Sequence, residues 1–311
     1  MWLYSVTMKF DRRYVFALLL CITFATETSA QLCTEWSEPA KIGQISAAEI
    51  DEASGLVPSA VYPGRLYWIN DSGDKARIYV TDSTGRLLQK FSFSGKKMKD
   101  TEALAYGDCG RDKCLIAADV GDNDAKRKSL TLVFIKEVEN FSKSVEPAMR
   151  LEIKFPDGPR DTEALALLPN GDLLFVTKKA ADVYVLPKAD LALTAKPTMK
   201  TLKKLGTLPM ATWFKEADPR GRVVTDMGID PKRAVAGLLT YQNALEIPLA
   251  RLTDLSGVSS WKAGVDFSPV TLRPLLQQET LTYSDGQLLW SSEVPVGTEA
   301  PIQALICRSG R

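Results

Sequence analysis

The sequence contains no histidine among its 311 residues. Imidazole is the general base of Ser-His-Asp hydrolases and a frequent nitrogen ligand of zinc, so its absence excludes both kinds of site. A metal bound by this chain must take mostly oxygen ligands, which favours calcium or magnesium. Any proton transfer must use a carboxylate, a lysine, a tyrosine or water.

Excess charge and long apolar runs are also missing. Lys and Arg number 39 and Asp and Glu 38, so the net charge is +1 and no basic footprint for nucleic acid is present. The apolar run at residues 14–24 is too short to span a bilayer. It follows Lys9, Arg12 and Arg13 and precedes small residues, which predicts a signal peptide over residues 1–30, cleaved after Ala30. We therefore expect a secreted or periplasmic protein without a transmembrane segment in its mature part; Leu20 is a poor residue before a lipidated cysteine, so a lipid anchor at Cys21 is not expected.

Cysteine is scarce, and Cys21 leaves with the signal peptide. The four that remain are an even number, as expected for disulfides in an exported chain. Cys109 and Cys114 flank a short hairpin and can pair with each other. Cys33 and Cys307 stand at opposite ends of the mature chain and can pair only if those ends are neighbours. Four free thiols are the alternative.

A repeat is present five times: an acidic residue heads the same short apolar pattern. The intervals of 50, 61, 63 and 53 residues each suit one four-stranded propeller blade. We predict an all-β, five-bladed β-propeller over residues 31–311 as a single domain, with six blades as the alternative. The first strand of every blade lines the central channel, which gathers five carboxylates around one axis: Glu52, Glu102, Glu163, Asp226 and Glu279.

The last blade lacks a fourth strand at the C-terminus. The runs ETLTYSDG, QLLWSSE and IQALICR supply three strands, and residues 34–43 can supply the other. Closure by strands from both termini removes the last open sheet edge and sets Cys33 beside Cys307.

Five acids in a ring predict a cation. Like charges at short range raise one another's pKa, and burial raises it further. A bound Ca²⁺, with six to eight oxygen ligands, relieves both effects. The alternative is that these acids accept backbone N–H bonds between blades and bind nothing.

Polar residues follow the second strand of each blade and are expected on one face of the disc. In WINDSGD and ADVGDND they offer oxygen ligands, although such residues also serve turns. If the protein is an enzyme, a carboxylate from these two loops would activate water: Asp71, Asp119 or Asp122. The predicted ligand-binding residues at this channel mouth are Asn70, Asp74, Arg77, Asn123, Lys178, Tyr241 and Glu293.

The motifs EASGL, WINDSGD, RIYVTDSTG, DTEALAYG and DVGDN together resemble a family of exported bacterial β-propeller proteins described as phytase-esterase-like or SdiA-regulated-like. The resemblance covers residues 49–179 well and the C-terminal blades loosely, and it implies the fold and export. The chain is distantly similar to soluble calcium-activated nucleotidases (apyrases), five-bladed propellers with an axial Ca²⁺. That likeness implies Glu102, Glu163 and Glu279 as the best calcium ligands.

Three functions follow as expectations. The first is a monomeric, calcium-containing propeller that binds a small molecule or an envelope protein at the channel mouth. The second is a Ca²⁺-dependent phosphoester or ester hydrolase, in which the metal polarises the reacting oxygen. The third is a disulfide-closed disc that uses its flat faces in an envelope complex.

Overall fold

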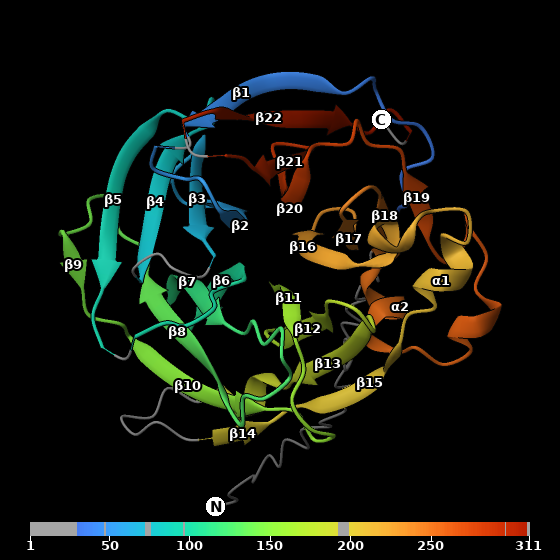
Figure 1. Cartoon of the computed structure of the whole chain (residues 1–311), viewed down its shortest axis with the longest axis horizontal. Coiled ribbons are helices and arrows are strands. Elements are labelled where there is room, and N and C mark those ends of the chain that lie inside the picture. The colour runs from blue at the N-terminus through green and yellow to red at the C-terminus, as the bar shows by residue number, and fades with distance from the viewer. Residues whose placement is uncertain are drawn as a thin grey trace, which may run out of the picture.

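The computed structural model describes residues 30–46, 48–71, 76–95, 97–191, 199–295 and 297–309. Residues 1–29 of the predicted signal peptide and the predicted site residue Asp74 lie outside the described residues. Five antiparallel sheets stand around a central axis and form a five-bladed β-propeller, which confirms the predicted fold (Figure 1).

The blades follow one another along the chain, each built outward from the channel. Blade one contains β2 (Ala53–Pro58), β3 (Arg65–Asn70), β4 (Arg77–Asp82) and β5 (Leu87–Phe93). Blade two contains β6 (Ala103–Cys109), β7 (Asp112–Asp119), β8 (Leu130–Lys136) and β10 (Met149–Lys154). Blade three contains β11 (Thr162–Leu167), β12 (Leu173–Thr177), β13 (Asp182–Leu186) and β15 (Lys203–Thr207). Blade four contains β16 (Val224–Asp230), β17 (Val235–Thr240), β18 (Ala244–Pro248) and β19 (Ser268–Val270). Blade five contains β20 (Gln277–Ser284), β21 (Gln287–Glu293), β22 (Glu299–Ile306) and the N-terminal strand β1 (Ala40–Ser46).

The inner strands of the five blades form a closed ring. β2 contacts β6, β6 contacts β11, β11 contacts β16, β16 contacts β20, and β20 contacts β2. All five lie nearest the centre of the disc (Figure 1). Because each inner strand touches two others, their first residues meet at one end of the channel and their last residues at the other.

Tight turns keep the strands of a blade in register. Asp285 and Gly286 join β20 to β21, and both have positive φ angles, 49° and 77°. A two-residue hairpin needs this left-handed backbone at both positions, which Asp and Gly tolerate best. The chemistry of such turns is the reason that strand boundaries could be predicted from Gly, Asp and Asn clusters.

Two short strands were not predicted. β9 (Ser144–Val145) pairs in parallel with β5, and β14 (Met199–Thr201) pairs in parallel with β10. Each comes from a connection of the following blade and extends the outer edge of the preceding one. Covering an edge strand in this way satisfies its backbone groups and ties neighbouring blades together.

The N-terminal strand β1 pairs antiparallel with β22 in blade five. The disulfide between Cys33 and Cys307 lies beside this pair, with an S–S distance of 2.08 Å, and the predicted Cys109–Cys114 disulfide is also present. β1 begins after Pro39, later than the predicted segment 34–43. Proline has no N–H to donate, so regular pairing starts beyond it, and only Trp36 bridges to Cys307 upstream.

The hydrophobic core lies between adjacent blades. One cluster packs Leu174 and Val183 of blade three against Leu238 of blade four, and similar clusters fill the other blade interfaces. Trp68 and Trp290 are fully buried. Helices are few: α1 (Met210–Trp213), α2 (Leu249–Thr253) and the 3₁₀ turns η1 (Lys188–Asp190), η2 (Pro219–Arg222) and η3 (Val258–Ser260). None of the helices in the described part of the chain has the length and apolar character needed to cross a membrane.

Candidate functional site: the acidic mouth of the channel

Carboxylates gather where the inner strands begin and the second strands end. We call this end of the channel the acidic mouth, and it is a product of topology. In each blade the first strand leaves this face and the second strand returns to it, as the antiparallel pairs β2–β3 and β6–β7 show. The mouth contains Asp71, Asp100, Glu102, Asp161, Glu163, Glu279 and Glu293, together with Lys178 and Tyr241.

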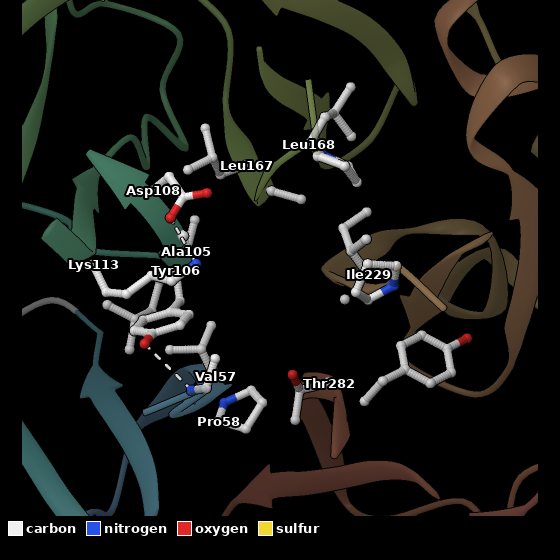
Figure 2. A pocket seen from close by; sticks show the side chains of 18 of the residues that line it. Val57, Pro58, Ala105, Tyr106, Asp108, Lys113, Leu167, Leu168, Ile229 and Thr282 are labelled. Atoms are coloured by element: carbon white, nitrogen blue, oxygen red, sulfur yellow. Dashed lines mark hydrogen bonds and ion pairs between the residues drawn. The ribbon is translucent and has the colours of Figure 1, made fainter. Parts of the chain in front are cut away.

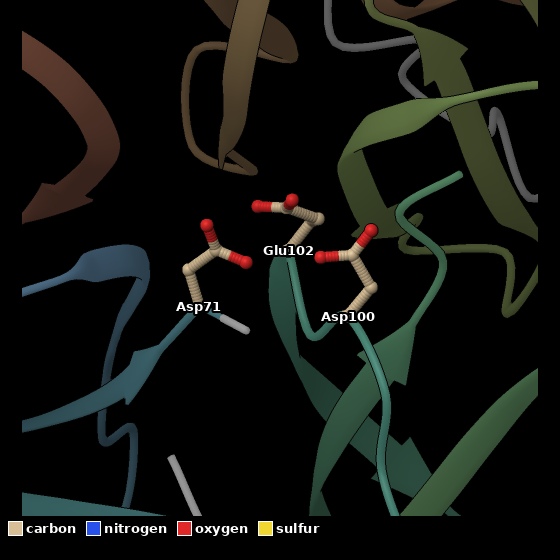
Figure 3. Close-up of side chains that lie close together, drawn as sticks. All are labelled: Asp71, Asp100 and Glu102. Carbon is tan, nitrogen blue, oxygen red and sulfur yellow. The ribbon is translucent and has the colours of Figure 1, made fainter. Parts of the chain in front are cut away.

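Three of these carboxylates point toward one another. One oxygen each from Asp71, Asp100 and Glu102 lies within 4.8 Å of the other two. Figure 3 shows these three side chains gathered together. Glu102 is buried, whereas Asp71 and Asp100 are half-buried. Among the described residues this is the group of acids whose geometry suits a metal ion, since such distances let one cation contact all three.

Backbone contacts hold the trio in place. The Asp71 N–H donates to the carbonyl of Glu52 at 2.8 Å, and the Glu102 N–H donates to Ala118 at 3.1 Å. The Gly121 N–H donates to the Asp100 carbonyl at 3.1 Å. A Cβ on Gly121 would lie only 2.5 Å from the Asp100 carboxylate, so this close approach requires glycine.

The crowding of negative charge shows in the pKa values. Burial, followed by the charges of Asp71 and Asp161, raises the pKa of Asp100 to about 6. Burial and then the charge of Glu163 raise the pKa of Glu102 well above its ordinary value. These carboxylates therefore hold protons more tightly than free ones do, and a cation would replace those protons.

One lysine stands among the acids of the mouth. Lys178 Nζ lies 2.7 Å from Glu163 Oε1, and both side chains are largely buried. Burial raises the pKa of Glu163 to about 8, even though Lys178 works to lower it. Burial works to lower the pKa of Lys178, but the charge of Glu163 outweighs it and the pKa is raised.

The remaining part of the mouth comes from blades four and five. The Tyr241 hydroxyl donates to Glu279 Oε1 at 2.7 Å, and the Gln277 amide donates to Glu293. Burial, followed by a hydrogen bond to Glu279, raises the pKa of Glu293 to about 9. The opening thus carries hydroxyl, ammonium and carboxyl groups at short range, which can orient a polar ligand.

The five predicted ring acids are not equivalent. Glu102, Glu163, Asp226 and Glu279 are buried, whereas Glu52 is exposed. Both carboxylate oxygens of Asp226 accept backbone N–H bonds, from Met227 at 2.7 Å and from Leu281 at 2.6 Å. Asp226 therefore links β16 to β20, which is the blade-to-blade anchoring that the sequence left open as the alternative to metal binding.

The predicted water-activating residues differ in their surroundings. Asp71 lies in the carboxylate trio, whereas Asp119 and Asp122 hold the loop after β7. Asp119 accepts a hydrogen bond from the Asp100 N–H at 3.0 Å and forms an ion pair with Arg127 at 2.7 Å. Asp122 accepts the N–H groups of Lys126 at 2.9 Å and Arg127 at 2.8 Å.

The other predicted ligand-binding residues are spread over this face. Asn70 is buried at the end of β3 and donates to Asp51 Oδ1 at 3.1 Å. Arg77 begins β4, where its guanidinium donates to the Tyr79 hydroxyl at 3.0 Å. Asn123 is exposed in the turn after β7. Of the predicted set, Lys178 pairs with Glu163, Tyr241 donates to Glu279, and Glu293 is itself a carboxylate of the mouth.

Sequence reasoning missed Asp100 and Asp161. Both stand two residues before a ring acid, in the repeated motif DTEALA at the start of blades two and three. The repetition of the first acid as well as the second was the available signal. Asp161 Oδ1 accepts the Asp122 N–H at 2.8 Å, and its charge raises the pKa of Asp100.

Two buried oxygens at this end of the channel test whether a cation fits. Asp161 Oδ2 and Asn70 Oδ1 accept no hydrogen bond from the described residues. A buried oxygen without a donor is costly, and a carboxylate and an amide oxygen are both calcium ligands. The Asp71, Asp100 and Glu102 carboxylates offer oxygen donors alone at spacings that one cation can contact, which fits Ca²⁺.

Comparison with known proteins assigns no family to this chain. No protein-family model matches the chain, and no curated protein sequence matches it, so the family resemblance stays a prediction. Among solved structures, virginiamycin B lyase from Staphylococcus aureus is similar at 10% identity and a TM-score of 0.38, covering 82% of this chain and 66% of the lyase. This chain thus spans just under two thirds of the lyase's length. A luciferin-regenerating enzyme shows 9% identity and a TM-score of 0.48 over 87% of this chain and 95% of that enzyme. Myxococcus xanthus glutaminyl cyclase shows 10% identity and a TM-score of 0.46 over 86% of this chain and 96% of the cyclase.

Proposed function

We propose that this protein is an exported propeller whose acidic mouth binds Ca²⁺ and uses the ion to hold a small ligand or a partner's anionic group. One observation carries the proposal: the oxygens of Asp71, Asp100 and Glu102 lie within 4.8 Å of one another at the channel opening. Three carboxylates at this spacing repel one another unless a cation or protons intervene. Ca²⁺ neutralises them at neutral pH, where protons are scarce.

Several features favour Ca²⁺ over other metals. The chain has no histidine, and the four mature cysteines form disulfides, so nitrogen and thiolate ligands are absent. The oxygens come from different blades and from loops, which suits the flexible geometry of Ca²⁺ better than the strict octahedron of Mg²⁺. The disulfides support export, because they persist in oxidising compartments where calcium is also abundant.

Two carboxylates of the trio, those of Asp71 and Asp100, are only half-buried, so an ion bound there would also be accessible to a ligand. A cation held by the trio would therefore keep positions for water or for a ligand oxygen. Lys178 and Tyr241 stand at the same mouth with a positive charge and a hydroxyl group. A carboxylate or phosphate group on a small molecule or an envelope protein is the ligand chemistry that this set would recognise.

The hydrolase alternative depends on Asp71. Of the three carboxylates predicted to activate water, Asp119 already accepts the Asp100 N–H and forms an ion pair with Arg127. Asp122 already accepts the N–H groups of Lys126 and Arg127. Asp71 alone lies in the trio, where a metal-bound ester or phosphoester would be within reach. Turnover of a phosphoester that is lost in Asp71→Asn while calcium still binds would favour this alternative over binding alone.

Calorimetric titration of Ca²⁺ into the chelator-treated mature protein tests the proposal. We expect about one calcium per chain and a melting temperature that falls in chelator. Asp100→Asn and Glu102→Gln should each weaken calcium binding at least tenfold, about 1.4 kcal/mol. Asp108→Asn is the matched control, because this exposed acid lies at the opposite end of β6 and should leave calcium binding unchanged. Wild-type protein that neither binds calcium nor responds to chelator would refute the metal site.

A further inference from the structure

A second cavity opens at the end of the channel opposite the acidic mouth. It encloses about 1000 Å³ and is lined by the last residues of the five inner strands. Figure 2 shows these side chains around an open centre. On β6, Glu102 precedes the strand and Tyr106 lines the cavity, so four residues of extended chain, about 13 Å, separate the two sites.

The walls of this cavity are apolar. Aliphatic side chains from four of the inner strands face it, and aromatic rings or short side chains complete the ring. A volume of this size matches pockets that hold small organic molecules, which occupy about 300–1,000 Å³. We call it the apolar cavity, and its walls include Val57, Leu104, Leu165, Leu167, Met227 and Ile229.

Six charged residues line the entrance, and three of them, Asp108, Lys113 and Asp230, form ion pairs. Asp108 forms an ion pair with Lys113 at 2.6 Å, and Asp230 forms one with Arg233 at 2.8 Å. Acidic and basic charges in these pairs cancel at short range. The net charge of the entrance is therefore set by the charged side chains that have no partner of opposite sign.

Two lysines at the entrance are unpaired. Lys188 on η1 and Lys232 after β16 both line the cavity, are exposed, and form no ion pair within the described residues. Asp285 is the single lining acid in the same condition. The unpaired side chains at the entrance therefore carry a net positive charge, and the interior of the cavity is apolar.

We propose that the apolar cavity binds a small anionic amphiphile, with its hydrocarbon part between the inner strands and its carboxylate beside Lys188 and Lys232. Burial of the hydrocarbon supplies most of the affinity, at about 25 cal/mol per Å² of apolar surface. The lysines select the sign of the head group. This site is separate from the acidic mouth, whose carboxylates would repel the same ligand when calcium is removed.

Displacement of the fluorescent probe 8-anilinonaphthalene-1-sulfonate by decanoate, in chelator, tests this proposal without calcium. We expect decanoate to bind at least tenfold more tightly than decyltrimethylammonium, which has the same chain and the opposite charge. Lys188→Glu combined with Lys232→Glu should remove that preference while circular dichroism stays unchanged. Lys143→Glu, an exposed lysine away from the cavity, is the matched control.

A second variant probes the walls. Leu167→Asp places a carboxylate in the half-exposed apolar wall and should weaken decanoate at least tenfold. Equal binding of the cation and the anion, or unchanged decanoate affinity in the double lysine variant, would overturn the proposal. So would the absence of probe binding to the wild type.

Discussion

The two ends of the channel are built from the same five strands and have opposite chemistry. At the beginning of β6, Glu102 is buried among carboxylates, and at its end Tyr106 and Asp108 border an apolar cavity. Charged groups at the acidic mouth are buried or half-buried and interact strongly, whereas the unpaired Lys188, Lys232 and Asp285 at the cavity entrance are exposed. The difference shows that one set of inner strands can place a cluster of carboxylates at one end and an apolar cavity at the other.

The largest expected effect of a single substitution is at the acidic mouth. Arg127→Ala should destabilise the protein by about 3–5 kcal/mol, because Asp119 would remain buried and unpaired. The same change removes the bond from Arg127 to the Gly121 carbonyl, next to Asp100. Urea unfolding measures the loss. Asp119→Asn combined with Arg127→Ala should recover part of it, and a single variant as stable as the wild type would contradict the importance of this pair.

Removal of the disulfide between the chain ends tests whether both sites depend on the stability of the closed ring of blades. Cys33→Ser with Cys307→Ser should cost about 2–5 kcal/mol, since this bond closes a loop of 274 residues in the unfolded chain. Calcium and amphiphile binding should then weaken together near the lowered melting temperature. Cys109→Ser with Cys114→Ser is the control, because it opens a loop of only 5 residues and should cost less.

The pH dependence of the free energy of unfolding should report on the acidic mouth. Asp100 and Glu163 have pKa values raised from 3.8 and 4.5 to about 6 and about 8 in the folded chain. The folded state holds these protons more tightly than the unfolded state, so their contribution is present below about pH 4 and is lost as the pH rises through 6 and 8. Melting curves in chelator should show this decline, and excess calcium should flatten it. A melting temperature that rises over this range in chelator would contradict the assignment.

The smallest expected effect is at the cavity entrance. Lys113→Ala breaks an ion pair whose side chains are 36% and 77% exposed, so it should change stability by about 0–1 kcal/mol. Thermal melting of this variant beside Arg127→Ala compares an exposed pair with a buried one on the same blade. A loss as large as that of Arg127→Ala would mean that the entrance is far less solvated than its exposure indicates.

Much of the fold could be predicted because it rests on local patterns. Turns such as Asp285-Gly286 and the recurrence of an acid before each inner strand are visible in the chain itself. The two parallel edge strands, β9 and β14, could not be predicted, since their pairing depends on which blade edge the connecting loop passes. Two or three residues carry no periodicity from which a strand can be inferred.

The location of the candidate site could be predicted from the sequence, but only some of its residues could. Glu102 belonged to the predicted ring and Asp71 to the predicted face, and the structure brings them together. Asp100 was missed, although its motif repeats before Glu163. Asp226 was placed among the ligands, but both of its oxygens accept backbone N–H bonds, and such a choice between partners is decided by sub-ångström packing.

By itself the sequence predicted five blades, the two cysteine pairs and mostly oxygen ligands for any metal, because spacing and composition act through local geometry. The tertiary structure alone decided which acids face one another, which of them anchor blades, and that a hydrocarbon-sized cavity lies at the far end of the same strands. The physical reason is that carboxylate pairing and cavity shape depend on contacts between blades far apart in the chain, where small displacements change the partner of each group.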